Sequence, residues 1–89
     1  MNVVDNEAES RYELEVDGAV AVAAYALERD RITFTHTVVP PALEGRGIAT
    51  RLIEGALADV RARGLKAVPV CAFVVRYFEK HGEARDLLA

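Results

Sequence analysis

The stretch "THTVVPPALEGRGIATRL", residues 35–52, joins the pattern of a strand to the pattern of a helix. Residues 32–39 alternate apolar side chains with threonines, which predicts a strand. Pro40 and Pro41 end that strand, because proline has no backbone N–H for a sheet ladder. From Gly47 to Arg63, apolar residues recur every three or four positions, which is the period of an amphipathic helix.

Two glycines stand at the start of this predicted helix, where glycine is a poor helix former. The first backbone N–H groups of a helix have no partner within it, and the helix dipole adds positive charge there. Glycine at positions 45 and 47 would let a bulky anion approach these groups, and Arg46 would add an ion pair. The pattern predicts a phosphate-binding loop. The nucleotide motif GxxxxGK[ST] is absent, and GxGxxG fails because position 50 is threonine.

The flanking segments complete an α/β pattern. Residues 11–16 alternate apolar and charged side chains, and an Asp-Gly pair at 17–18 predicts a tight hairpin to a second strand at 19–27. A short buried strand at 66–70 and a helix at 72–81 follow. The predicted fold is a mixed sheet of three antiparallel strands, then a helix, a parallel strand and a second helix.

Composition limits the classes of protein. The 89 residues predict one domain, 1–89, with a flexible N-terminus at 1–10. A net charge of −3 argues against nucleic acid or an anionic membrane as a partner, and no apolar run is long enough to cross a bilayer. One cysteine and two histidines do not favour a metal site. The N-terminus lacks the pattern of a signal peptide, so we expect a cytoplasmic protein.

The stretch from residue 44 to 49, "EGRGIA", resembles the acetyl-CoA pyrophosphate loop of the GNAT N-acetyltransferase superfamily, usually [QR]xxGx[GA]. Gly47 and Ala49 match this pattern, whereas Glu44 replaces the usual glutamine or arginine and is not expected to contact the cofactor. The resemblance covers about 80 residues, and more narrowly the chain looks like the short single-domain YjdJ-type branch. It implies a minimal GNAT-like core with acetyl-CoA as the acetyl donor.

The resemblance also implies where acetyl-CoA binds. The end of the third strand would offer backbone groups to the pantetheine arm and the thioester carbonyl, and the glycine loop would hold the diphosphate. The implied cofactor-binding residues are Val38, Val39, Gly45, Arg46, Gly47, Ile48, Ala49 and Thr50.

Two residues are candidates for catalysis. His36, predicted on one strand face with Ile32, Phe34 and Val38, is either a general base for the amine or a structural side chain. Cys71 lies where the fourth predicted strand meets the last helix. It has two possible chemical roles: it protonates the departing CoA thiolate, or it accepts the acetyl group itself. The third alternative is a small buried hydrophobic residue without a chemical role. Phe78 occupies the position of the tyrosine acid of larger relatives.

We therefore expect an N-acetyltransferase that moves an acetyl group to an undefined amine, as a monomer or weak homodimer. The alternative is a non-catalytic acyl-CoA-binding module that acts as a sensor or as a partner's subunit. A plain interaction domain, whose glycine loop is only a turn, is the third reading.

Overall fold

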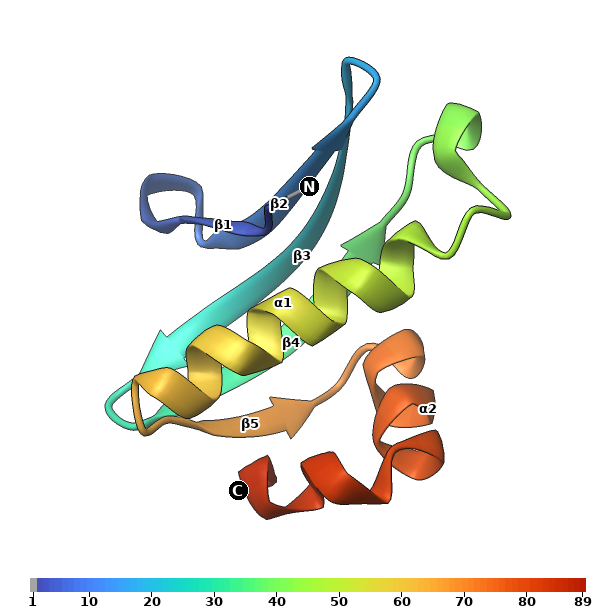
Figure 1. The fold of residues 1–89 in the computed structure, drawn as a ribbon. Helices are drawn as coiled ribbons and strands as arrows, with labels where there is room; N and C mark the ends of the chain where they lie inside the picture. Colours follow the sequence, from blue (N-terminus) through green and yellow to red (C-terminus); the bar gives the residue numbers. More distant parts are fainter. Residues whose placement is uncertain (1) are drawn as a thin grey trace.

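The computed structural model describes residues 2–89 as one five-stranded mixed sheet with helices packed against it (Figure 1). The strands are β1 (Val4–Asn6), β2 (Arg11–Val16), β3 (Ala19–Glu28), β4 (Arg31–Val38) and β5 (Lys66–Pro69). The helices are α1 (Ile48–Ala62) and α2 (Ala72–Lys80), with 3-10 turns η1 (Glu7–Glu9), η2 (Pro41–Leu43) and η3 (Gly82–Leu87). The spatial order of the strands is β1-β2-β3-β4-β5.

The order and type of the predicted elements are confirmed. β2, β3 and β4 pair antiparallel, and β4 pairs parallel with β5 through the α1 crossover. The β2–β3 turn has positive φ angles of 52° at Asp17 and 80° at Gly18, which is the geometry that favours Asp-Gly in a two-residue hairpin. Pro69 lies at the end of the last strand of the sheet order, where its missing N–H is tolerated.

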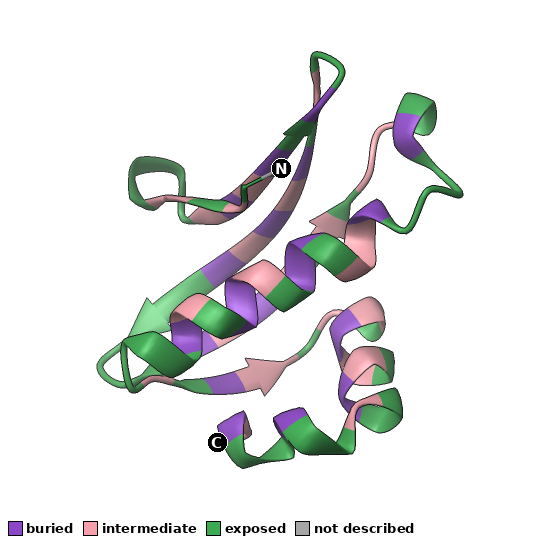
Figure 2. Cartoon of the chain, in the orientation of Figure 1, coloured by how far each residue is buried: buried purple, intermediate pink, exposed green. Residues whose placement is uncertain are grey.

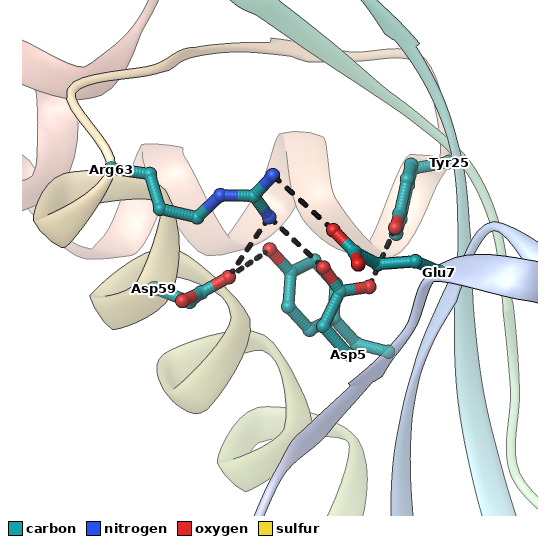
Figure 3. Close-up of polar contacts among 6 residues, drawn as sticks. Asp5, Glu7, Tyr25, Asp59 and Arg63 are labelled. Carbon is teal, nitrogen blue, oxygen red and sulfur yellow. Dashed lines mark hydrogen bonds and ion pairs between the residues drawn. The ribbon is translucent and has the colours of Figure 1, made fainter.

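The predicted strand count was too low by one, because β1 was not expected. This strand pairs antiparallel with β2. Polar contacts attach it to the C-terminal end of α1 (Figure 3). Arg63 Nη1 lies 2.9 Å from Asp5 Oδ2. The other carboxylate oxygen of Asp5 accepts a hydrogen bond of 2.5 Å from the Tyr25 hydroxyl. Arg63 contacts Asp59 as well, and Asp59 accepts a hydrogen bond of 2.7 Å from Tyr12. Burial and the adjoining carboxylates raise the pKa of both tyrosines, so they donate these hydrogen bonds at neutral pH.

One face of the sheet and the inner side of α1 form the core. Buried residues alternate along β2 and recur at helical spacing along α1, as the purple bands show (Figure 2). The predicted α1 stripe is buried at Leu52, Ile53, Ala56, Leu57 and Val60. In α2, Val74 and Phe78 are buried, whereas Phe73, Tyr77 and the following His81 are partly exposed. None of the helices within residues 2–89 is both long and apolar enough to cross a membrane.

The prediction that His36 and Val38 share a face with Ile32 and Phe34 was wrong. The β3–β4 register shifts between Ala24 and Tyr25: Tyr25 is opposite Phe34, whereas Ala24 is opposite His36. Thr35 is therefore an extra residue in β4, a β-bulge. After the bulge, Thr37 is opposite the buried Ala23, so it faces the core side, and His36 faces the other side and is exposed. A one-residue shift reverses the faces because side chains alternate with a period of two.

Candidate functional site

The loop between β4 and α1 presents a row of free backbone amides. Gly45 and Gly47 have φ angles of 76° and 71°, in the left-handed region where glycine is favoured. Gly47 is the N-cap of α1, and no side chain caps the helix. The first backbone hydrogen bond is the 3.2 Å contact from Arg51 N to Gly47 O. Within residues 2–89, no protein group accepts a hydrogen bond from the amides of residues 45–50. These amides and the helix dipole can therefore bind an anion.

These amides border an open cavity of about 270 Å³. It is lined by Val39, Leu43, Glu44, Gly45, Gly47, Ile48, Ala49, Thr50 and Phe73. Six of the eight residues predicted to bind the cofactor are in this set. Arg46 is not, because its guanidinium contacts Asp17 of the β2–β3 turn at 3.2 Å. Glu44 borders the cavity although no contact was expected from it, and Leu43 and Phe73 were not predicted at all.

Strands β4 and β5 separate beside this cavity (Figure 1). Their last pair is Phe34 with Pro69, and β4 continues to Val38 without a partner on that side. The carbonyl of Phe34 accepts hydrogen bonds from both Val70 N and Cys71 N, at 3.1 and 3.0 Å, where the chain turns out of the sheet into α2. The end of β4 can therefore offer backbone groups to an extended ligand. The Val38 side chain is 55% exposed on the sheet face opposite the core. Only the backbone of Val38 is therefore placed to contact such a ligand.

The Cys71 thiol lies at the start of α2, opposite the end of β4. Cys71 is the N-cap of α2 and is partly buried, and its Sγ is 3.4 Å from the Thr37 hydroxyl oxygen. Burial raises the pKa of the Cys71 thiol, but the hydrogen bond with Thr37 and the backbone amides of Val74, Phe73 and Thr37 outweigh it, and the net pKa is lowered. A thiol with a lowered pKa is a better nucleophile at neutral pH and also a readier proton donor.

Replacing Thr37 with valine should make Cys71 less reactive. Valine keeps the branched shape but removes the hydroxyl, so the pKa of the thiol should rise and alkylation by iodoacetamide at pH 7 should slow about threefold to tenfold. Because Cys71 is the only cysteine, the rate reports on this thiol alone. The pH at which the alkylation rate reaches half its maximum should move upward in Thr37→Val and return to the wild-type value in Thr37→Ser. An unmoved midpoint in Thr37→Val would show that the hydroxyl does not tune the thiol.

Neither Cys71 nor the other candidates for proton transfer line this cavity. His36 is exposed on the strand face opposite Thr37 and does not line the cavity. Its role as a general base stays a prediction. That role requires the amine substrate to approach from the face on which His36 lies. Phe78 is 3% exposed and has no hydroxyl. Tyr77 borders a neighbouring, smaller cavity. Cys71 is the titratable side chain nearest in sequence to Phe73, which lines the main cavity.

Comparisons with known proteins support the fold described above. The family model for GCN5-related N-acetyl-transferase matches residues 11–87. The solution NMR structure of a GCN5-like protein from Staphylococcus aureus is similar to the chain with a TM-score of 0.75 and 23% sequence identity. That alignment covers 99% of this chain and 87% of the other. At this identity the likeness supports the fold alone. A search of curated proteins returned no match.

Proposed function

Because the chain belongs to the GCN5-related N-acetyltransferase family, we propose that it binds acetyl-CoA and transfers the acetyl group to an amine. The observation that carries this proposal is the row of unpaired amides from residue 45 to 50, which borders the 270 Å³ cavity. A diphosphate needs several donors converging on one region, and a left-handed glycine pair followed by a helix N-terminus supplies them.

The strand end and the loop would hold the two ends of acetyl-CoA. The amides of the loop would bind the diphosphate, and Val39, Ile48 and Phe73 would pack against the pantetheine arm. Beyond Phe34, β4 is paired with β3 but no longer with β5. The backbone groups on the side that β5 has left would hydrogen-bond the amide groups of the pantetheine arm. Acetyl-CoA supplies a thioester, whose carbonyl carbon accepts the amine nitrogen.

Cys71 has two chemical options in this arrangement. As an acid, its thiol gives a proton to the CoA thiolate when the C–S bond breaks and the C–N bond to the amine forms, and the proton lost from the amine nitrogen returns to the Cys71 thiolate or goes to solvent. As a nucleophile, its thiolate attacks the thioester carbon and releases CoA thiolate; the amine then attacks acetyl-Cys71, the Cys71 thiolate leaves, and the proton lost from the amine goes to solvent or a base. Both options balance in atoms and charge, and the lowered thiol pKa supports each.

A non-catalytic acyl-CoA-binding module remains the second proposal. The observation that favours it is the buried phenylalanine at position 78, where resemblance to larger relatives implies a tyrosine acid. The two proposals share the cofactor site and differ in turnover alone. Release of free thiol from acetyl-CoA in the presence of a panel of primary amines separates them, because a sensor releases none above the rate without protein.

Acetyl-CoA binding is the first test of the proposed function. At 100 times its dissociation constant, acetyl-CoA should stabilise the folded chain by about 2.7 kcal/mol, seen as a rise in the thermal midpoint. In an NMR titration, the amide signals of residues 45–50 should shift most. An unchanged midpoint together with unmoved loop signals would leave the interaction-domain reading as the better one.

A further inference from the structure

A second cavity adjoins the main one between α1 and α2. Its volume is about 90 Å³, and it is lined by Thr50, Phe73, Arg76, Tyr77, Lys80 and His81. Thr50 and Phe73 line both cavities, so the two share a wall. Every charged group in this lining is basic, because no carboxylate contributes to it. The size suits a phosphate group better than a whole nucleotide.

Within residues 2–89, the two cations of this cavity have no ion-pair or side-chain hydrogen-bond partner. Arg76 and Lys80 are one helical turn apart, so they lie on the same side of α2, and both are exposed. Neither takes part in a salt bridge or a side-chain hydrogen bond in the described part of the chain, whereas the arginines at 11, 46, 61 and 63 are all paired with carboxylates. A pair of unpaired cations beside an anion-binding loop is suited to a second anionic group of the same ligand.

Glu79, which precedes Lys80 in α2, lines a different cavity together with Pro69 and Arg85. Burial raises the pKa of Tyr77, and the charges of Glu54 and Glu83 raise it further, so both carboxylates lie near that ring. They line a different cavity, formed between α1 and η3. Glu83 is also paired with His81 at 3.2 Å. Tyr77 and His81 stack with ring centroids 4.1 Å apart.

We propose that Arg76 and Lys80 form a phosphate subsite for the 3′-phosphate of acetyl-CoA. The inference rests on the proposed function and extends it, because a diphosphate on the loop amides brings the attached ribose to the wall shared at Thr50 and Phe73. The subsite gives the chain a preference for CoA thioesters over their dephospho forms. It also supplies positive charge locally in a chain whose net charge is −3.

The test compares CoA with 3′-dephospho-CoA, which differ only in this phosphate, by isothermal titration. The wild-type chain should bind CoA about tenfold more tightly, as expected for charge-assisted contacts to exposed cations. In the double variant Arg76→Gln, Lys80→Gln, the two affinities should become equal through weaker binding of CoA, with dephospho-CoA unchanged. The matched control is Arg29→Gln, Arg31→Gln, which removes two exposed cations at the β3–β4 turn that take part in no salt bridge within residues 2–89.

The outcomes separate the subsite from the proposed function. Equal affinities in the wild-type chain, or a preference that survives in the double variant, would overturn the subsite and leave acetyl-CoA binding intact. An equal loss of preference in the control would show that general charge, rather than a local contact, recognises the phosphate, and would also overturn it. If the wild-type chain binds neither probe, the proposed function fails as well.

Discussion

Replacing Gly47 with valine is expected to weaken acetyl-CoA binding about 100-fold, which is about 2.7 kcal/mol. Gly47 has a φ of 71°, lines the main cavity, and has no atom within 4 Å of the position that a Cβ would occupy. A side chain there would meet no other atom of the protein, although the positive φ strains it, and it would stand where a diphosphate approaches the amides. Binding should therefore weaken in addition to the cost of that strain to folding. Titration calorimetry with acetyl-CoA measures the effect.

Gly64 provides the matched control for that variant. Its φ is 68°, and an added Cβ there would also meet nothing within 4 Å. It follows the other end of α1, after Arg63, so Gly64→Val imposes the same kind of backbone strain, on the order of 1–2 kcal/mol, away from the cavity. The two variants should lose similar thermal stability, and only Gly47→Val should lose affinity. Comparable losses of affinity in both would mean that the loop amides do not hold the diphosphate.

Replacing Cys71 with alanine is expected to lower kcat for acetyl transfer about 100-fold or more, with little change in the dissociation constant of acetyl-CoA. Alanine removes the proton donor and nucleophile while keeping a small side chain at a partly buried position. Because the sulfur is not part of the diphosphate loop, binding should persist. The assay follows free thiol released across an amine panel, beside calorimetric binding of acetyl-CoA. Full turnover in Cys71→Ala would remove the thiol from the mechanism.

Intact mass spectrometry distinguishes the two roles of the thiol. If the thiolate is the nucleophile, wild-type chain exposed to acetyl-CoA without an amine should gain one acetyl group, and an added amine should remove it. Cys71→Ala should gain none. If the thiol acts only as an acid, no adduct forms in either chain although turnover still falls in the variant.

Local sequence signals were sufficient for most of the fold. The Asp-Gly turn, the threonine-rich strand and the apolar stripe of α1 each depend on neighbours within a few residues, and all three are present. β1 escaped prediction because three residues are too few for a period-two pattern. Its position depends on contacts with remote residues, such as Asp5 with Arg63, 58 positions apart.

The part of the candidate site that comes from one continuous stretch of sequence was predictable. The glycine loop, the helix start and Val39 lie close together in the sequence, so their convergence on one cavity follows from the strand-loop-helix order. Phe73, Arg76 and Lys80 join the site only through the packing of α2 beside α1. The cofactor role of Arg46 stays a prediction; its pairing with Asp17 of the β2–β3 turn could not be foreseen, because the two residues are remote in sequence.

By itself, the sequence determined the types of the elements, their order, and the glycine geometry that leaves the loop amides free, since these follow from short-range periodicity and backbone preference. Only the tertiary structure decided which side chains meet. The bulge at Thr35 shows why: the apolar alternation continues through residue 38 with no local sign of a break, and the register shift is set by pairing with β3. That one extra residue turns Thr37 toward Cys71 and His36 away from it.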